Sequence, residues 1–507
     1  MFPLGRWFTA QGYQRPPSGQ TGKAGSPMHG AFSPLRWAAC LLAAHGAKFR
    51  AHPRNMRVAV LNIVGLSESL LGVHTPGLAA FAREQGIQSY APAFPAVTCT
   101  AQSAITTGET VGVHGIVANG WYDRESAEPR FWKQSNHIVR SEKIWDRLRR
   151  EVPGFTCAKL FWWYNMHAAV DFSITPRPLY PADGRKVFDI HTQPMLLRDE
   201  LKHDLGDFSF PSFWGPAAGI ASSEWIASSA KWIEEKHSPT LSLVYLPHLD
   251  YSLQKLGPHA PEIPAELQQI DRVASDLIAF YQFRGVRVIV LSEYGISPVS
   301  QPVHLNRLFR QKGWLSLKNE LGRETLDYGG SRAFAIADHQ VAHVYVNDPI
   351  IRDEVRALLD QTPGVDEVRL PRELWGNSVA TERAGDFIAI AEADAWFTYY
   401  FWNDDEVAPD YARTIDIHRK PGYDPCELFI DPKRRFPKLK IAAFLLKKKL
   451  GLRGLLDVIP LDATCVKGSH GRDKVPADER PVLIGAGSAV LCAEDIHRII
   501  IDAVKGA

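Results

Sequence analysis

Short, nearly unbroken runs of apolar residues recur along this chain, and they constrain its fold more than any other feature. The clearest are Arg57–Ile63, Leu241–Leu246 and Val286–Leu291. Runs of this length without polar alternation are typical of strands buried on both faces of a parallel sheet. Helical patterns lie between them, for example Ser223–Lys236 and Pro264–Phe283. This alternation predicts an α/β fold with a mostly parallel central sheet flanked by helices.

Weaker patterns extend this prediction at both ends of the chain. Residues 76–85 read as a helix, with Thr75 as N-cap and Pro76 at the first helical position. Val341–Val346 and Pro481–Ile484 are further strand candidates. We therefore expect one large domain over residues 56–507, with a smaller insertion or cap around residues 350–440.

The first 55 residues differ in composition from the rest. They hold seven of the 58 basic residues and no acidic one, so the remainder of the chain is mildly acidic. That balance argues against binding to a nucleic-acid polymer. Two interpretations of residues 1–55 stay open. In the first, the start codon was placed too early, translation begins at Met56, and these residues are a disordered extension. In the second, they are an Arg-rich targeting segment.

Cysteine usage and hydropathy bear on the compartment. The six cysteines show no close pairing, which fits isolated buried thiols in a reducing compartment. The longest apolar stretch of the N-terminal region, Trp37–Ala44, is far too short to cross a bilayer. We expect a soluble, cytoplasmic protein of undetermined oligomeric state.

Polar residues follow two of the predicted strands. Asp250 comes soon after Leu241–Leu246, and Glu293 is the second residue after Val286–Leu291. In open α/β sheets ligands bind outside the carboxyl ends of the strands, and Thr98 is expected at the same edge. A threonine hydroxyl there can act as a nucleophile if a metal ion or an adjacent base activates it.

Several blocks, in order, carry a resemblance to a known family. They include Thr75-Pro-Gly-Leu, Ala93–Gly108, His114–Asp123, Asp250–Pro258, Val288–Gly295 and Gly468-Ser-His-Gly. Together they make residues 56–500 similar to the alkaline phosphatase superfamily and, within it, to the type I phosphodiesterase/nucleotide pyrophosphatase family. The resemblance implies a threonine nucleophile and two divalent metal ions, commonly zinc, that clamp the attacking and leaving oxygens.

The resemblance assigns roles position by position. Thr98 matches the nucleophile, while Asp250 and His470 match metal ligands. Five other positions differ from the family: Val64 stands for an aspartate, Gln254 for a histidine, Glu293-Tyr294 for Asp-His, and Ala101 for an asparagine. Glu293 keeps a carboxylate and is retained as a ligand, whereas valine and tyrosine cannot replace carboxylate and imidazole.

Other residues can complete the site. Asp416 and His418 lie two apart, so on a strand both would face the same side; they are candidate metal ligands or an ordinary ion pair. Asn119, Arg177 and His304 are candidate substrate-binding residues. For Arg177 the alternative is a solvated loop, and for His304 it is the start of a helix.

Further residues had open interpretations. His248 is a candidate near the metal, sharing a strand face with Asp250. His339 and His343 read as structural, and the Trp162–Tyr164 cluster reads as core or as a stacking surface.

The sequence therefore predicts a hydrolase that cleaves a phosphate diester or pyrophosphate bond, with Thr98 as nucleophile and at least one divalent metal. Two alternatives stay open: a relative with impaired catalysis that binds a phosphorylated metabolite, and a phosphotransferase or phosphomonoesterase. The expected partner is a phosphorylated small molecule. Residues 433–455 hold nine Lys/Arg and no acid, which allows weak contact with a membrane surface, steering of a phosphorylated substrate, or simply a solvated helix.

Overall fold

The central sheet confirms the predicted fold class. The computed structural model describes residues 56–506, which fall within one unit of the chain, residues 53–507. Its largest sheet contains, in spatial order, β2 (Ile87–Ser89), β20 (Val482–Ile484), β9 (Arg287–Leu291), β1 (Val58–Ile63), β8 (Leu241–Leu246), β5 (Cys157–Leu160), β6 (Phe172–Pro176) and β7 (Ile190–Gln193). The pairs from β9 to β6 are parallel, and β2, β20 and β7 add antiparallel edges. The sheet is therefore mostly parallel, as the apolar runs predict.

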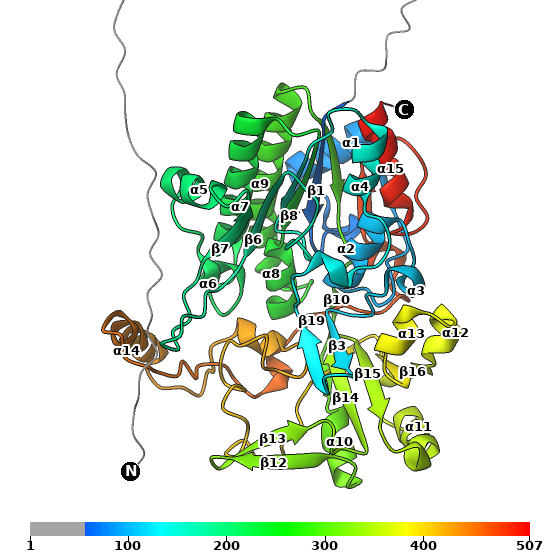
Figure 1. Cartoon of the computed structure of the whole chain (residues 1–507), viewed down its shortest axis with the longest axis vertical. Coiled ribbons are helices and arrows are strands. Elements are labelled where there is room, and N and C mark those ends of the chain that lie inside the picture. Colours follow the sequence, from blue (N-terminus) through cyan, green and yellow to red (C-terminus); the bar gives the residue numbers. More distant parts are fainter. Residues whose placement is uncertain (1–55, 507) are drawn as a thin grey trace, which may run out of the picture. The chain divides into compact units, whose positions relative to one another are not determined.

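Helices cover both faces of this sheet. Figure 1 shows α7, α8 and α9 on one side and α2, α4 and α15 on the other. The helices of the structure are α1 (Pro76–Gln85), α2 (Thr98–Thr107), α3 (Val111–His114), α4 (Ile144–Glu151), α5 (Leu197–Leu205), α6 (Phe210–Phe213), α7 (Ile220–His237), α8 (His248–Leu256), α9 (Ile263–Phe283), α10 (Leu305–Gln311), α11 (Arg352–Asp360), α12 (Pro371–Trp375), α13 (Val379–Arg383), α14 (Pro437–Lys449) and α15 (Asp495–Lys505). Every residue of β1 is buried between these layers.

A second, antiparallel sheet lies beyond the central one in sequence. Its strands are, in spatial order, β14 (Ala333–Asp338), β15 (Val341–Val346), β17 (Phe387–Ala391) and β16 (Val365–Arg369). Short two-stranded ladders complete the structure: β3 (Gly120–Asp123) with β4 (Glu128–Phe131), β10 (Ser297–Pro298) with β19 (Gly468–Ser469), β11 (Gln301–Val303) with β18 (Ala395–Phe397), and β12 (Ser316–Glu320) with β13 (Arg323–Asp327). β15 is thus a strand as predicted, but it belongs to the second sheet.

The expected cap around residues 350–440 covers only part of this second sheet, because β14 and β15 precede it. As a separate unit it stays a prediction. Residues 1–55 lie outside the described residues, so their interpretation as an extension or a targeting segment stays a prediction.

Two local predictions need correction. α1 begins at Pro76 as predicted, but the Thr75 side chain does not cap it; its hydroxyl donates instead to the Leu70 carbonyl. Asp416 and His418 lie in an irregular, turn-containing segment and not on a strand, so their spacing places them on no common face.

Candidate active site

Thr98 is the first residue of α2, a helix that is buried along its whole length. Val97 precedes it in an extended conformation and occupies the N-cap position. The backbone amide of Cys99 donates to the side-chain oxygen of Asn119 at 2.9 Å, which holds the first turn in place. A helix N-terminus favours negative charge, since its amides and its dipole point toward it. The Thr98 side chain therefore lies where an anionic group would be stabilised.

A chain of hydrogen bonds connects Thr98 to a carboxylate. Thr98 Oγ1 lies 2.9 Å from Tyr294 Oη, and Tyr294 Oη donates to Asp250 Oδ1 at 3.2 Å. Because a phenol has one hydrogen and Tyr294 gives it to Asp250, the Thr98 hydroxyl is the donor in the first bond. The three side chains form a directed path from Thr98 through Tyr294 to Asp250.

Burial sets the protonation of this path. It raises the pKa of Asp250 to about 7, against the opposing effect of hydrogen bonds from Gln254 and Tyr294. The pKa of Tyr294 lies well above its ordinary value, chiefly because of burial and then because of the nearby Asp250 carboxylate. Tyr294 is therefore a neutral phenol that can accept from one neighbour while it donates to the other.

His470 packs against this path. Its ring stacks on Tyr294 with the centroids 3.7 Å apart, and its Nδ1 lies 2.7 Å from the Ala96 carbonyl oxygen. Burial lowers the pKa of His470 well below its ordinary value, so the ring is neutral and donates from Nδ1. Its Nε2 lies 3.7 Å from Asp250 Oδ1 and has no hydrogen-bond partner among residues 56–506.

Glu293 lies beneath Thr98, fully buried at the end of β9. One of its oxygens accepts from the side-chain amides of Asn62 and Gln102. Its other oxygen has no partner within residues 56–506, and burial raises the pKa of the carboxyl to about 8. The carbonyl oxygen of the same Gln102 accepts from the Trp163 backbone amide at 2.7 Å, so this network also fixes part of the cavity wall.

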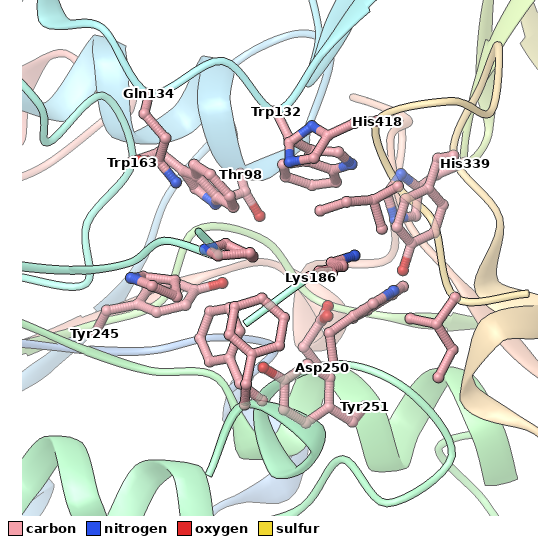
Figure 2. Close-up of a pocket in the computed structure, with 18 of the residues that line it drawn as sticks. Thr98, Trp132, Gln134, Trp163, Lys186, Tyr245, Asp250, Tyr251, His339 and His418 are labelled. Atoms are coloured by element: carbon pink, nitrogen blue, oxygen red, sulfur yellow. The ribbon is translucent and has the colours of Figure 1, made fainter. Parts of the chain in front are cut away.

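A mainly aromatic cavity opens in front of Thr98. Figure 2 shows Trp132 and Trp163 drawn near Thr98, with Asp250 and Tyr251 across the space. The lining residues are Thr98, Trp132, Gln134, Trp163, Pro176, Pro178, Lys186, Phe210, Phe213, Trp214, Tyr245, Asp250, Tyr251, Tyr294, His339, Ile415, Ile417, His418 and Tyr423. The cavity has a volume of about 80 Å³ and is open to solvent on one side.

The sequence-predicted residues divide into two groups. Thr98, Asp250, Glu293 and His470 lie together, as described above. His418 is further away in the cavity lining, and Asp416 does not line it. The Asp416 backbone amide donates to Glu427.

The three candidate substrate-binding residues lie outside the cavity lining. The Asn119 side chain is occupied by Cys99 on one side and by Asp338 on the other. Arg177 is exposed and donates to Met166 Sδ, while His304 pairs with Thr398 at 2.7 Å beside α10, which begins at the next residue. Asn119 and His304 therefore have structural partners.

His248 does not share a strand face with Asp250, because both belong to α8. Its Nε2 lies 3.1 Å from Glu266, away from Thr98. His343 is structural as interpreted, since it contacts the Val117 carbonyl oxygen and accepts from the Gly385 amide.

The residues present do not fit the two-metal site that the resemblance implies. Gln254 is held by Asp250 and Tyr423, while Tyr294 is bound to Thr98 and Asp250. Val64 offers no donor side chain. Within residues 56–506 no three His, Cys, Asp or Glu side chains are grouped closely enough to hold a metal ion. Among residues 56–506, His470 Nε2 and one oxygen of Glu293 are the candidate ligand atoms that have no hydrogen-bond partner.

The sequence did not predict that Tyr294 bonds to both Thr98 and Asp250, nor did it predict most of the residues that line the cavity. Tyr294 was visible only as a replaced ligand. Trp163 lines the cavity, whereas its neighbours Trp162 and Tyr164 are buried core. His339, interpreted as structural, lines the cavity in a left-handed conformation (φ 60°) and stacks on Tyr423. No periodic pattern marks these residues, because they come from loops and strand ends.

Comparison with known proteins agrees with this architecture. A sequence model described as type I phosphodiesterase/nucleotide pyrophosphatase matches residues 58–424. An uncharacterised pyrophosphatase/phosphodiesterase of Schizosaccharomyces pombe is 26% identical over 295 residues, which are 56% of this chain and 53% of that protein. This chain thus spans about half the length of that relative.

Two solved structures share the fold. Murine ectonucleotide pyrophosphatase/phosphodiesterase 5, solved as an inactive variant in complex with AMP, has a TM-score of 0.52 and 16% identity, covering 89% of this chain and 95% of that one. Phosphonoacetate hydrolase of Sinorhizobium meliloti, in complex with phosphonoformate, has a TM-score of 0.54 and 14% identity, covering 89% and 96%. At these identities the likeness establishes the fold.

Proposed function

The chain belongs to the type I phosphodiesterase/nucleotide pyrophosphatase family, and from that premise we propose that it hydrolyses a phosphate diester or pyrophosphate bond with Thr98 as the nucleophile. The observation that carries the proposal is the hydrogen-bonded path from Thr98 through Tyr294 to Asp250. A nucleophile bonded to a group that can remove its proton, with that group bonded in turn to a third, is the recurrent arrangement of covalent catalysis.

The chemistry follows from this path. Thr98 Oγ1 attacks phosphorus and passes its proton to Tyr294 Oη, while the Tyr294 proton moves to Asp250 Oδ1. The bond from phosphorus to the leaving oxygen breaks, and the leaving group departs as an anion. Water then attacks the phosphothreonine ester, and the bond from phosphorus to Oγ1 breaks. One water proton stays on the product phosphate and the other passes to solvent, while the proton held by Asp250 returns through Tyr294 to Thr98.

Two other features support an anionic substrate at this place. The N-terminus of α2 favours the negative charge that develops around phosphorus. Lys186 in the cavity lining is a cation that can attract a phosphate. The aromatic walls offer stacking surfaces for a planar or apolar part of the substrate.

Members of this family generally use divalent metals. When bound, such ions lower the pKa of the nucleophile and neutralise charge on the phosphoryl oxygens. Because Asp250, Gln254 and Tyr294 are hydrogen-bonded to one another, the proposal assigns proton removal to Tyr294 and Asp250.

Asp250, Gln254 and Tyr294 are hydrogen-bonded to one another, and this also favours a second candidate function. In that function the protein binds a phosphorylated ligand and turns it over little. Hydrolysis of bis(p-nitrophenyl) phosphate by wild type, Thr98→Ser and Thr98→Ala separates the two. We expect turnover in wild type, less in Thr98→Ser and none above background in Thr98→Ala. Equal and negligible turnover in all three, with AMP binding measured by calorimetry, would favour the second candidate.

The covalent step has its own readout. Acid quenching during turnover, followed by intact-mass measurement, should show a phosphoryl adduct on wild type that maps to Thr98. Turnover that persists in Thr98→Ala would refute the nucleophile assignment, while leaving the diester hydrolase open. Phosphate release only in the presence of an alcohol acceptor would indicate a phosphotransferase.

A further inference from the structure

Residues 433–455, here called the basic segment, are built differently from the rest of the chain. They hold nine Lys/Arg and no Asp or Glu, in a chain that is otherwise mildly acidic. α14 forms their centre, and Figure 1 shows it set off from the central sheet. A segment of one charge sign has no ion pairs within itself, so its partners must lie elsewhere on this chain or on another surface.

α14 carries two apolar faces. Ile441 and Phe444 are half-buried on the inner face, and Ile441 packs against the core beside the second sheet. The outer face consists of Leu439, Ala442, Ala443, Leu446 and Leu450, spaced three or four residues apart. This spacing aligns side chains along one side of a helix. The inner face therefore attaches the helix, and no residue in the range 56–506 covers the outer face.

The outer face is open to solvent over its whole length. Leu439 is 69% exposed, Leu446 59% and Leu450 65%. Leu452 and Leu455, just after the helix, are exposed as well. Single exposed leucines are ordinary on protein surfaces, but a contiguous row of them marks a surface that contacts something apolar.

Cations border this row. Lys438, Lys447 and Lys449 form no ion pair with any residue in the described range 56–506, whereas Lys440 and Arg434 are paired with Asp457. The unpaired lysines flank the outer leucines along the helix. A row of leucines edged by lysines matches a bilayer surface, where acyl chains lie beneath anionic headgroups.

The basic segment is also attached to the rim of the cavity. Lys448 Nζ lies 4.8 Å from the ring centroid of Phe188, which stacks on Phe210 at 4.7 Å. Phe210 lines the cavity in front of Thr98. Arg453 donates to the Asp183 carbonyl at 3.0 Å, near the exposed side chains of Leu179 and Tyr180. The inner side of α14, which carries Lys448, is thus attached to the loop that lines one side of the cavity.

We propose that the outer face of α14 binds an anionic lipid bilayer surface. A second copy of the chain is a poorer occupant, since it would place two sets of like charges together. No helix within residues 56–506 is long and apolar enough to cross a bilayer, so the contact is one in which α14 lies along the surface. This inference stands independently of the proposed hydrolysis.

Vesicle flotation of the full chain tests the proposal. We expect binding to vesicles of phosphatidylcholine with phosphatidylserine, weak binding to phosphatidylcholine alone, and release at high salt. The variant Leu439→Gln/Leu446→Gln/Leu450→Gln should partition less, by about tenfold for each leucine that enters the lipid. Lys438→Glu/Lys447→Glu/Lys449→Glu should lose the preference for anionic vesicles.

The matched control is Leu321→Gln, a fully exposed leucine in the β12–β13 turn, which should bind like wild type. Because all substituted residues are exposed, melting temperatures should agree among the variants. Absence of binding by wild type, or equal binding by wild type and the triple leucine variant, would overturn the proposal. So would a wild-type dimer in solution that the leucine variant converts to monomer, because the occupant would then be a second copy.

Discussion

The phenol of Tyr294 lies between the Thr98 hydroxyl and the Asp250 carboxylate, and it changes what this site can do. In the aligned blocks a histidine that binds metal stands at this position. A phenol with a raised pKa is a poor metal ligand but a good hydrogen-bond relay, since it donates and accepts at the same oxygen. The replacement therefore keeps Thr98 connected to a group that can accept its proton.

Tyr294→Phe tests the relay directly. The substitution removes the hydrogen bonds to Thr98 and Asp250 but keeps the ring that stacks on His470. We expect kcat for bis(p-nitrophenyl) phosphate to fall about 10²- to 10⁴-fold, which is the usual contribution of a positioned proton acceptor. Tyr281→Phe, which removes a buried hydroxyl on α9 away from the cavity, serves as control. Unchanged kcat in Tyr294→Phe would mean that the path carries no proton.

Lys159 gives a separate prediction about pH. It is buried on β5, where Nζ donates to the carbonyl oxygens of Trp163 and Tyr164 at 2.7 and 2.9 Å. Burial lowers its pKa to about 7, whereas lysine in the unfolded chain titrates near about 10.4. Between these values the unfolded state binds more protons, so the contribution of Lys159 to the free energy of unfolding rises with pH.

Lys159→Met should remove that dependence. Between about pH 7 and about pH 10 the free energy of unfolding of wild type should rise relative to the variant by about 1.4 kcal/mol per pH unit. Denaturant unfolding at several pH values measures the difference. Parallel curves for the two proteins would show that Lys159 keeps an ordinary pKa in the fold.

At the scale of elements, buried strands were predictable and their sheets were not. β1 and β8 lie where their apolar runs placed them, and α9 begins within a residue of its prediction. Burial on both faces leaves a direct mark in the sequence. β15 was recognisable as a strand, but its partners β14 and β17 depend on contacts that periodicity does not record.

The candidate site was predictable in a similar, partial way. Motif blocks located Thr98, Asp250 and His470, because each lies next to a strand or helix end that the blocks define. They could not show that Tyr294 reaches Thr98, since that depends on how closely α2 approaches the end of β9. The aromatic walls come from loops whose paths are set by tertiary packing.

Asn119 illustrates how elements are joined near the site. Its side chain accepts from the Cys99 amide in α2 and donates to Asp338 at the end of β14, and its backbone amide also donates to Asp338. It thereby ties the first turn of α2 to the second sheet. Unpaired buried polar groups are costly, so this bridge should matter for stability.

Asn119→Ala should lower the free energy of unfolding by about 1 to 3 kcal/mol, because the Cys99 amide and Asp338 each lose a partner. We expect kcat to fall with little change in KM, since Thr98 loses its support. Asn319→Ala, on the exposed strand β12, is the control. A raised KM with unchanged stability would instead support the substrate-binding role predicted from the sequence.

At the scale of the whole molecule, the open question is how far the fold of this family can keep its chemistry with a different set of donors. The fold matches over nearly the whole length of two solved structures, yet three of the side chains at the expected metal positions, Asp250, Gln254 and Tyr294, are hydrogen-bonded to one another. A metal bound by Asp250 and His470 would use the carboxylate oxygens that already accept from Tyr294 and Gln254. The relay and a metal site would therefore draw on the same carboxylate.

Removing metal from the purified protein distinguishes the Thr98–Tyr294–Asp250 relay from a metal bound by Asp250 and His470. If the relay holds Asp250, the purified chain should contain less than one equivalent of zinc, manganese or other divalent metal by elemental analysis. Exhaustive chelation should change neither its melting temperature nor its turnover of bis(p-nitrophenyl) phosphate, because no ligand that stabilises the fold is withdrawn. Asp250→Asn should abolish turnover under both conditions, since the amide cannot accept the proton as a carboxylate does. A stoichiometric metal, with turnover lost on chelation and restored by zinc, would show instead that the chain uses a metal and that the relay alone does not activate Thr98.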